Sequence, residues 1–357
     1  MLSKQFENFL SLVRLGIGHS SYGFSCDIDW QSMEALAVRH GLSAVILDGI
    51  DRMSDDRRPP KELSLQWIGE VIQNYEHRFE SYCRAIAELA GFYKSHGYKM
   101  MVLKGYACSL DWPKPEHRLC GDIDIWQFGQ QKFCDVLISS EENIDVDYSH
   151  HHHTVFYWRD FMVENHYDFI NVHHHKSNAS FENILKELGQ DDSHYVSVYE
   201  EKVYLPSPNL HALFLLKHIM IHFAAEHVFL RQILDWAFFV NKHSQDVNWE
   251  WLERVLDCYG MRPLYEIINS ICITDLGFNA NYFPAVQYDP LLKNRVLNEI
   301  LCPEFGFELP DNILKRVAFK IHRWYGSFWK HELCYNESRW SAFGSGVWNH
   351  VLKPSSI

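Results

Sequence analysis

Two aspartates at alternate positions, in the segment GDIDIW that begins at Gly121, constrain this chain more than any other feature. Apolar residues alternate with the acids, which is the pattern of a half-buried β-strand. Residues two apart in a strand point to the same face, about 6.6–7 Å from each other. Asp122 and Asp124 are therefore expected to share one face, while Ile123 and Ile125 point into a core. Two carboxylates on one face can hold a divalent metal ion.

An apolar run that ends in a lysine and a glycine precedes the aspartates. We expect a strand at Met101–Leu103, a turn at Lys104 and Gly105, and a short helix around Tyr106–Leu110. Lys104 and Arg118 are the cations expected to meet an anionic substrate, the lysine as a point charge and the arginine as a bidentate donor. An ion pair of Arg118 with Asp122 or Glu116 is the alternative.

A third carboxylate is expected on a later strand, at Phe161–Phe169, which is rich in bulky and β-branched residues. Glu164 is the candidate for this third carboxylate. The alternative is that Glu164 is simply an exposed acid on a strand face. Asp168 competes with it, since it has the same parity but lies about 13 Å further along a regular strand. His166 shares the face of Glu164, either as a partner of the site or as a packed core histidine.

The charge balance argues against a nucleic-acid partner. The chain has 33 Lys and Arg against 46 Asp and Glu, a net charge of −13, and no run of basic residues, whereas binding to DNA or long RNA requires a basic surface. Nine scattered cysteines without a CxxC pair indicate reduced thiols. No apolar run approaches the roughly 20 residues of a membrane span, and the start of the chain is too charged for a signal peptide. We therefore expect a cytoplasmic protein without a membrane partner.

Helical periodicity dominates both ends of the chain. Residues 1–57 look helical and irregular, and apolar positions from Lys61 to His96 recur in steps of three and four, which predicts one long helix or two helices end to end. Ser207 and Pro208 are the expected N-cap and first residue of a helix. The helices predicted beyond them are Asn209–Ala225, Leu230–His243, Trp249–Tyr259, Pro263–Ile273, Pro290–Leu301 and Pro310–Tyr325.

The predicted sheet lies between these helical ends. Its strands are Tyr98–Leu103, Gly121–Trp126, Ile144–Tyr148, Thr154–Trp158 and Phe161–Phe169, with a helix at Gln130–Ser139 and a hairpin of Val196–Tyr199 with Lys202–Leu205. The fold class is α+β, with a small mixed, mostly antiparallel sheet and flanking helices. The absence of a glycine-rich strand–turn–helix argues against a Rossmann fold. The expected domains are an N-terminal helical region (1–76), a sheet-bearing core (77–206) and a C-terminal helical domain (207–357).

The order of these motifs resembles the nucleotidyltransferase superfamily, which has a DNA polymerase beta-like fold, and more narrowly an uncharacterised bacterial branch of it. The resemblance covers roughly Phe79 to Asn241. It rests on Leu103-Lys104-Gly105, Arg118, Asp122-Ile123-Asp124, Val163-Glu164-Asn165-His166, His218, His222, Arg231 and Asp235. Tyr106 is a departure, because the superfamily usually has Gly or Ser after this glycine, which lets backbone amides approach the triphosphate.

The resemblance implies an enzyme that transfers an NMP group from an NTP, with ATP expected, to a hydroxyl of an unidentified small-molecule or protein acceptor. Mg²⁺ or Mn²⁺ would bind Asp122, Asp124 and Glu164, which are also the catalytic residues. Two such ions can hold the attacking and leaving oxygens. The expected nucleotide-binding residues are Lys104, Gly105, Arg118 and Lys217. The expected substrate-contacting or supporting residues are His166, His218, His222, Arg231 and Asp235.

Other interpretations remain open. Tyr106 would suit a catalytically lapsed nucleotide-binding or scaffold protein on the same fold. A DxD metal-dependent glycosyltransferase would need alternating strands and helices before the aspartates, where this chain is mostly helical. On the C-terminal helices, interior histidines and a surface pair of Arg231 with Asp235 are the alternatives to a substrate-binding wall. The clusters His150–His153 and His173–His175 are predicted to be loop histidines, since no cysteine or acid lies at zinc-site spacing from them.

Overall fold

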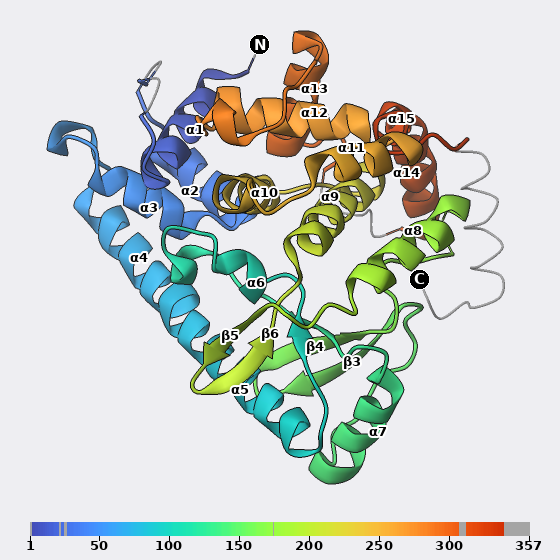
Figure 1. Ribbon diagram of the computed structural model, residues 1–357. Coiled ribbons are helices and arrows are strands. Elements are labelled where there is room, and N and C mark those ends of the chain that lie inside the picture. The colour runs from blue at the N-terminus through green and yellow to red at the C-terminus, as the bar shows by residue number, and fades with distance from the viewer. Residues whose placement is uncertain (1, 21–22, 25–26, 174, 307–311, 339–357) are drawn as a thin grey trace. The chain divides into compact units, whose positions relative to one another are not determined.

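The computed structural model describes residues 2–20, 23–24, 27–173, 175–306 and 312–338 (Figure 1). The chain divides into two compact units. Unit 1 contains the chain up to Val71, together with Leu216–Ser244 and Trp249–Asn336, and unit 2 contains Ile72–Leu215, Gln245–Asn248 and residues 337–338. Helix α9, Pro208–Ala225, contributes its first half to unit 2 and its second half to unit 1.

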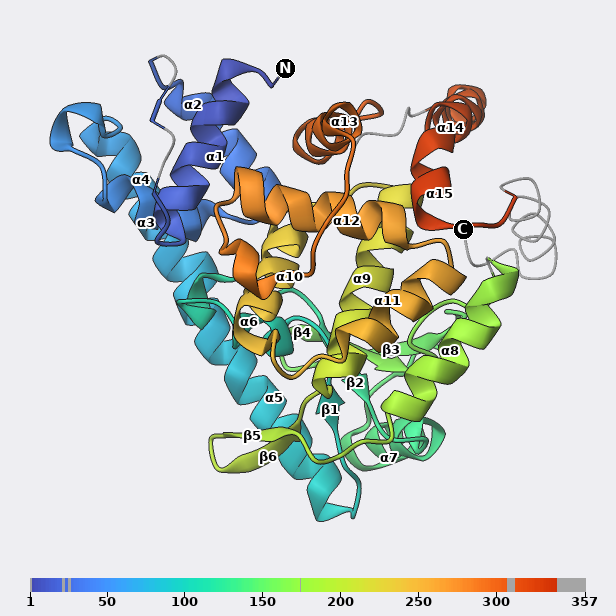
Figure 2. The same ribbon diagram turned by 45° about the horizontal axis from the view of Figure 1, so that its top comes forward.

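Unit 1 is helical in its described residues, and its core contains the fully buried rings of Phe9, Trp67 and Trp236. Helices α1 and α3 cross closely because Gly49 carries no side chain: a Cβ there would lie 2.4 Å from the Leu12 carbonyl oxygen (Figure 2). Besides part of α9, the elements are α1 Lys4–Gly16, α2 Trp30–His40, α3 Ser43–Asp51, η1 Asp55–Arg57, α4 Lys61–Val71, α10 Leu230–His243, α11 Trp249–Cys258, α12 Arg262–Ser270, η4 Ile271–Asp275, η5 Ala280–Tyr282, α13 Pro290–Leu301, α14 Ile313–Gly326 and α15 Phe328–Cys334.

The helix predictions hold well. Leu230–His243 and Pro290–Leu301 are confirmed at both ends. The helix predicted at Pro263–Ile273 gives way at Ile271 to the π-helix η4. The last predicted helix was placed from Pro310, which lies outside the described residues, and α14 begins at Ile313. Among the described helices, none is both long and apolar enough to cross a membrane.

The long amphipathic stretch from Lys61 is indeed two helices end to end. Helix α4 is followed by the π-helix η2, Ile72–Glu76, and then by α5, His77–Ser95. Helix α5 ends at Ser95, and Gly97 follows with φ +83° and with its amide donating to the Lys94 carbonyl at 3.0 Å.

Unit 2 is organised around one six-stranded sheet of order β3-β4-β2-β1-β6-β5. Three of its five strand pairs are antiparallel, while β2 with β4 and β1 with β6 are parallel, which confirms the mixed, mostly antiparallel sheet. The strands are β1 Met101–Val102, β2 Ile123–Trp126, β3 His153–Trp158, β4 Phe161–His166, β5 Tyr195–Val198 and β6 Glu201–Tyr204; the remaining elements are α6 Tyr106–Ser109, η3 Pro115–His117, α7 Gln131–Glu142 and α8 Lys176–Leu188.

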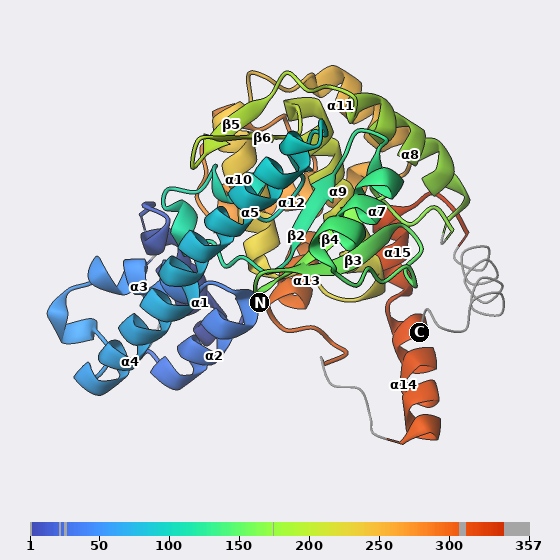
Figure 3. The ribbon, with the colours of Figure 1, turned by 90° about the horizontal axis from the view of Figure 1, so that it is seen from below.

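One face of this sheet packs against α5 and α7, which lie in front of the strands in Figure 3. Ile123, Ile125 and Val163 point into this core and are fully buried. Since successive residues of a strand point to opposite faces, Asp124 and Glu164 lie on the other face. The prediction that the isoleucines of the GDIDIW segment face a core is confirmed.

Two strand predictions are corrected. Ile144–Tyr148 makes only the isolated bridge between Asp147 and Val155, because the Asp147 side chain accepts the Ser149 amide and turns the chain away. The strand predicted at Phe161–Phe169 ends at His166, since the amides of Tyr167 and Asp168 both donate to one carbonyl, that of His152, at 2.8 and 3.0 Å. Because both amides donate to the same carbonyl, the hydrogen-bond ladder between the strands ends here. Asp168 therefore does not lie on the strand face of Glu164.

Candidate active site

The two carboxylates at the centre of the site face each other across neighbouring strands. β2 and β4 run parallel, with Asp124 opposite Glu164 in the register. The two acids and His166 each offer one ligand atom, and these three atoms lie within 4.8 Å of one another. Asp124 and Glu164 are separated by 40 positions in the sequence, so the pairing of the two strands creates the cluster.

Asp124 is buried at 2 % exposure and its Oδ1 has two cationic partners. Lys104 Nζ lies 2.7 Å from this oxygen and His166 Nε2 lies 2.9 Å from it. The turn that carries Lys104 is tied to the same strand, because the Leu103 amide donates to the Asp124 carbonyl at 3.0 Å. The positive charges of Lys104 and His166 thus balance the negative charges of the two acids.

The pKa directions follow from this compensation. Burial alone would raise the pKa of Asp124, but Lys104 and His166 hold it far below its usual range. Burial would lower the pKa of His166, but its contacts with Asp124 and Glu164 raise it to about 9. Burial also opposes ionisation of Glu164, yet the contact with His166 keeps its pKa below the usual value. The acids are therefore ionised at neutral pH and His166 is protonated.

Asp122 lies just before β2, beside this cluster. Burial raises the pKa of its carboxyl group, the Asp124 charge raises it further, and Lys104 acts against both. Among the described residues, the groups of three or more convergent ligands do not include Asp122. The predicted set of Asp122, Asp124 and Glu164 thus appears as Asp124, Glu164 and His166, with Asp122 alongside.

Tyr82 of α5 fixes the backbone on which Asp122 sits. Its ring is fully buried and its hydroxyl donates to the Asp122 carbonyl at 2.7 Å. Gly105, with φ +54°, leaves room for this hydroxyl, since a Cβ there would lie 2.5 Å from the Tyr82 oxygen. Spacing alone did not reveal Tyr82, because it belongs to the apolar stripe of its helix and only its hydroxyl reaches the site.

Tyr106 and Arg118 complete this side of the site. Tyr106 opens α6 and turns its ring into the core, where it is stacked on Phe79 at 6.3 Å between centroids. Arg118 is buried, and its guanidinium donates to the Leu119 carbonyl at 3.2 Å.

Two histidines that were predicted to be loop residues belong to the cluster. His153 is the first residue of β3, is buried, and has Nε2 3.7 Å from Glu164 Oε1. One ring nitrogen each of His152, His153 and His166 forms a second group within 4.8 Å. Burial and neighbouring imidazoles lower the pKa of His152 to about 2; burial chiefly lowers that of His153 to about 4. The loop prediction is right for His150–His152, His173 and His175, wrong for His153, and His174 lies outside the described residues.

The donor set suits a divalent metal ion. Carboxylates and imidazoles are the side chains that bind such ions in proteins, and here they converge from β2, β4 and β3 on one face of the sheet. On the same face, Lys104 and His166 place positive charge next to the carboxylate of Asp124.

A family model described as "Uncharacterised nucleotidyltransferase" matches residues 27–272, well over half of the 357-residue chain. The chain belongs to this family. The matched region contains every residue that the sequence analysis placed at the site. A crystal structure of an antigenic nucleotidyltransferase-like protein from Paracoccidioides brasiliensis is 14 % identical, with a TM-score of 0.36, and the match covers 56 % of this chain and 95 % of that one. A search of curated proteins found no match.

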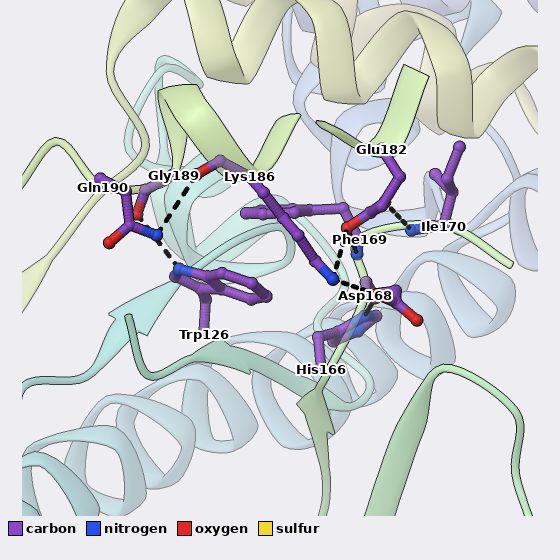
Figure 4. Close-up of polar contacts among 9 residues, drawn as sticks. All are labelled: Trp126, His166, Asp168, Phe169, Ile170, Glu182, Lys186, Gly189 and Gln190. Carbon is purple, nitrogen blue, oxygen red and sulfur yellow. Dashed lines mark hydrogen bonds and ion pairs between the residues drawn. The ribbon is translucent and has the colours of Figure 1, made fainter. Parts of the chain in front are cut away.

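In this member of the family, helix α8 and the loop before it hold the end of β4 (Figure 4). His166 Nδ1 contacts the Asp168 carbonyl at 3.2 Å, and the Asp168 side chain pairs with Lys186 of α8. Glu182 of α8 accepts the amides of Phe169 and Ile170 at 2.9 and 3.1 Å. Asp168, the competitor for the third carboxylate, is thus engaged with Lys186.

The opposite face of the sheet carries a buried polar network that keeps β3 and β4 in place. Asp135 of α7 is fully buried and accepts from Thr154 at 3.0 Å and from Asn165 at 2.7 Å. The Tyr167 hydroxyl donates to it as well. Thr154 follows His153 in β3, and Asn165 lies between Glu164 and His166 in β4. Since successive side chains point to opposite faces, holding Thr154 and Asn165 on this side directs the other three residues to the ligand face, the side of the sheet that carries Asp124.

The remaining predicted residues lie in unit 1. Lys217 is buried, with its Nζ 4.6 Å from the centre of the Tyr335 ring. The rings of His218 and His222 meet edge to face, with their centroids 4.4 Å apart. His222 Nδ1 lies 3.5 Å from Glu226 Oε2. Arg231 is half-buried and Asp235 buried, one turn apart on α10.

Proposed function

We propose that this protein transfers a nucleoside monophosphate from an NTP, with ATP as the expected donor, to a hydroxyl of a small-molecule or protein acceptor, and that Mg²⁺ or Mn²⁺ is required. Asp122, Asp124 and Glu164 are the proposed metal ligands and catalytic residues. Lys104, Gly105, Arg118 and Lys217 are the proposed nucleotide-binding residues. His166, His218, His222, Arg231 and Asp235 are proposed to contact substrate or to support the site.

The observation that carries the proposal is the in-register pairing of Asp124 with Glu164, with Lys104 on the same oxygen as His166. Ionised carboxylates on one face of a rigid sheet can hold a dication without rearrangement of the backbone. Membership of the nucleotidyltransferase family supports the reaction class.

The reaction forms a bond between the acceptor oxygen and the α-phosphorus. The bond from that phosphorus to the oxygen bridging the β-phosphate breaks, and pyrophosphate leaves. The acceptor proton needs a base, and Glu164 is the group we assign, because it is ionised at neutral pH while His166 already carries a proton. His166 instead stabilises the two carboxylates by hydrogen bonding.

When bound, a divalent ion would neutralise phosphate charge and favour departure of pyrophosphate. We assign Lys104 a share in that role, because its ammonium lies 2.7 Å from Asp124 Oδ1. A bulky residue after Gly105 could block the approach of a triphosphate to the backbone amides. The Tyr106 ring instead points inward and packs on Phe79.

Titration of the metal-free full-length protein with ATP, with and without Mn²⁺ or Mg²⁺, tests the proposal. We expect divalent-dependent binding that the double variant Asp122→Asn with Glu164→Gln weakens by at least about tenfold. Asp160→Asn is the matched control, since Asp160 is an exposed acid in the turn between β3 and β4. Release of pyrophosphate across a panel of hydroxyl acceptors then identifies the reaction.

Three outcomes would point to a different function or to different metal ligands. Binding of a sugar nucleotide but not of an NTP would contradict the proposal in favour of a glycosyltransferase. Equal binding by the double variant and the wild type would contradict the assigned ligands. Tight NTP binding without pyrophosphate release over the whole panel is the result expected of a catalytically lapsed nucleotide-binding protein on this fold.

A further inference from the structure

The histidines at the start of β3 form a cluster of imidazole rings around His166. The ring centroids of His152 and His153 lie 4.4 Å apart, and those of His153 and His166 lie 5.4 Å apart. The rings of His152 and His166 are separated by 5.8 Å. One nitrogen from each ring lies within 4.8 Å of the other two.

The backbone holds these three residues together. His153 and His166 are opposite each other in the antiparallel register of β3 and β4. The His152 carbonyl accepts the two amides that follow His166, at 2.8 and 3.0 Å. The convergence of the three rings is therefore built into the sheet rather than produced by mobile side chains.

Two buried nitrogen atoms in this cluster have no hydrogen-bond partner among the described residues. His153 is 8 % exposed, and its Nδ1 and that of His152 are buried without a hydrogen bond in the described part of the structure. An unpaired polar atom in a buried position costs about 1–3 kcal/mol. Two such atoms side by side need an explanation, and a bound ion provides one.

His166 has the arrangement of a metal-binding histidine. Its Nδ1 contacts the Asp168 carbonyl at 3.2 Å, so Nε2, which here lies 2.9 Å from Asp124 Oδ1, is the nitrogen that an ion would take, with release of the proton it carries. Metal-ligating histidines typically use their second nitrogen in this way, since the backbone contact fixes the tautomer and the ring orientation. The Asp168 side chain is in turn held by Lys186.

We propose that His152, His153 and His166 form a binding site for a borderline transition-metal dication, for which Zn²⁺ is the probe, next to the carboxylates Asp124 and Glu164. The site shares His166 and Glu164 with the proposed machinery of nucleotidyl transfer, but Zn²⁺ binding can be measured without that reaction. Imidazole ligands suit Zn²⁺ and related ions, whereas Mg²⁺ prefers oxygen ligands and keeps its waters.

The ligand spacing is wider than that of a bound ion. A tetrahedral ion with Zn–N bonds of about 2.0–2.1 Å brings its nitrogens to about 3.4 Å from one another. The three nitrogens, which lie within 4.8 Å of one another, therefore have to move closer when an ion binds. Glu164, with one oxygen 3.7 Å from His153 and the other 3.5 Å from His166, is the nearest source of a fourth ligand.

Zn²⁺ titration of metal-free, tag-free full-length protein in excess Mg²⁺ tests the site. We expect one tight equivalent, and an affinity lower by about two orders of magnitude in the double variant His152→Gln with His153→Gln. The matched control is His151→Gln with His173→Gln. It removes two histidines from the same tracts, whose rings contact each other at 5.6 Å and belong to neither ligand group. The control should bind Zn²⁺ like the wild type.

Equal losses in both double variants would show that Zn²⁺ loads the histidine tracts adventitiously and would overturn the proposal. Unchanged binding in the His152/His153 variant would overturn it too. X-ray absorption at the zinc edge of the wild-type protein gives an answer that needs no variant. Three imidazoles bound to the ion support the site, and one or none overturns it.

The site can be tested separately from the proposed reaction. Asp122→Asn should weaken divalent-dependent ATP binding and leave Zn²⁺ affinity unchanged, because Asp122 belongs to neither group of convergent ligands. Loss of ATP binding with retained Zn²⁺ binding supports both proposals. Loss of Zn²⁺ binding in this variant would contradict the histidine site alone.

Discussion

Lys104 and His166 share a single acceptor, Oδ1 of Asp124, at 2.7 and 2.9 Å. One partner comes from the turn after β1 and the other from the end of β4, so the two cations join three strands at one buried oxygen. Each partner raises the stability of the charged form of Asp124 that metal binding needs. The same contacts make Lys104 a structural residue as well as a proposed phosphate ligand.

Replacement of Lys104 by methionine should lower stability in the absence of metal. The variant keeps the length of the side chain but leaves the buried Asp124 with only His166, and breaking a buried pair costs about 3–5 kcal/mol. Urea unfolding in EDTA measures the loss, and Mn²⁺ should restore part of it by replacing the missing charge. Lys132→Met, at an exposed position of α7, is the control and should change stability by less than about 0.5 kcal/mol. Equal stability of the two variants would contradict the assigned role of Lys104.

Replacement of Gly105 by alanine should disturb the turn through a collision with Tyr82. The new Cβ would lie 2.5 Å from the Tyr82 oxygen, at a φ of +54° that disfavours any side chain. We expect a loss of about 1–3 kcal/mol. Gly121→Ala, where a Cβ meets nothing within 4 Å, is the matched control and should be nearly neutral.

The Tyr82 contribution is separable in a double-mutant cycle. Tyr82→Phe removes the oxygen that the new methyl group meets, so Gly105→Ala should cost less in the Tyr82→Phe background than in the wild type. Strictly additive free energies of unfolding would show that the positive φ alone accounts for the loss.

Replacement of Asp135 by asparagine should weaken the ligand face although Asp135 lies behind it. An amide cannot accept from Thr154, Asn165 and Tyr167 at once, so buried donors lose their partner. We expect a loss of about 2–4 kcal/mol in urea unfolding and a weaker Mn²⁺ affinity in titration of the folded variant. Glu141→Gln, exposed on the same helix, should change neither quantity. A stable variant with full Mn²⁺ affinity would contradict the coupling between the two faces.

Glu182 should make stability fall as the pH rises through neutrality. Burial raises the pKa of this carboxyl group from 4.5 to about 7, although two backbone amides act against the shift. A group with a raised pKa contributes stability that is complete below the unfolded value and is lost above the folded one. At about 1.4 kcal/mol for each pH unit, the wild type should lose up to about 3 kcal/mol relative to Glu182→Gln between pH 4.5 and pH 8. Parallel urea unfolding curves of both proteins measure this difference, and a constant difference across the range would contradict it.

Strand periodicity and motif order are local properties, so the sequence alone predicts which segments carry the candidate residues. Asp122, Asp124 and Glu164 were placed by alternation and by the order of the motifs, and the helices by apolar spacing and capping residues. His153 was missed because its membership depends on the register of β3 with β4. His152 depends on a carbonyl that accepts two amides from a distant segment. Tyr82 and Asp135 act through long-range hydrogen bonds, which no local pattern of residue types encodes.

The parallel register of β2 and β4 makes the ligand cluster a property of one strand alignment. A slip of one residue along β4 would turn Glu164 and His166 toward α7 and present Val163 and Asn165 instead. A slip of two residues would keep Glu164 and His166 on their face but move Glu164 out of line with Asp124. Metal uptake by this chain would therefore report native strand alignment, and a trace of divalent ion during refolding would favour the correct register over its neighbours by mass action.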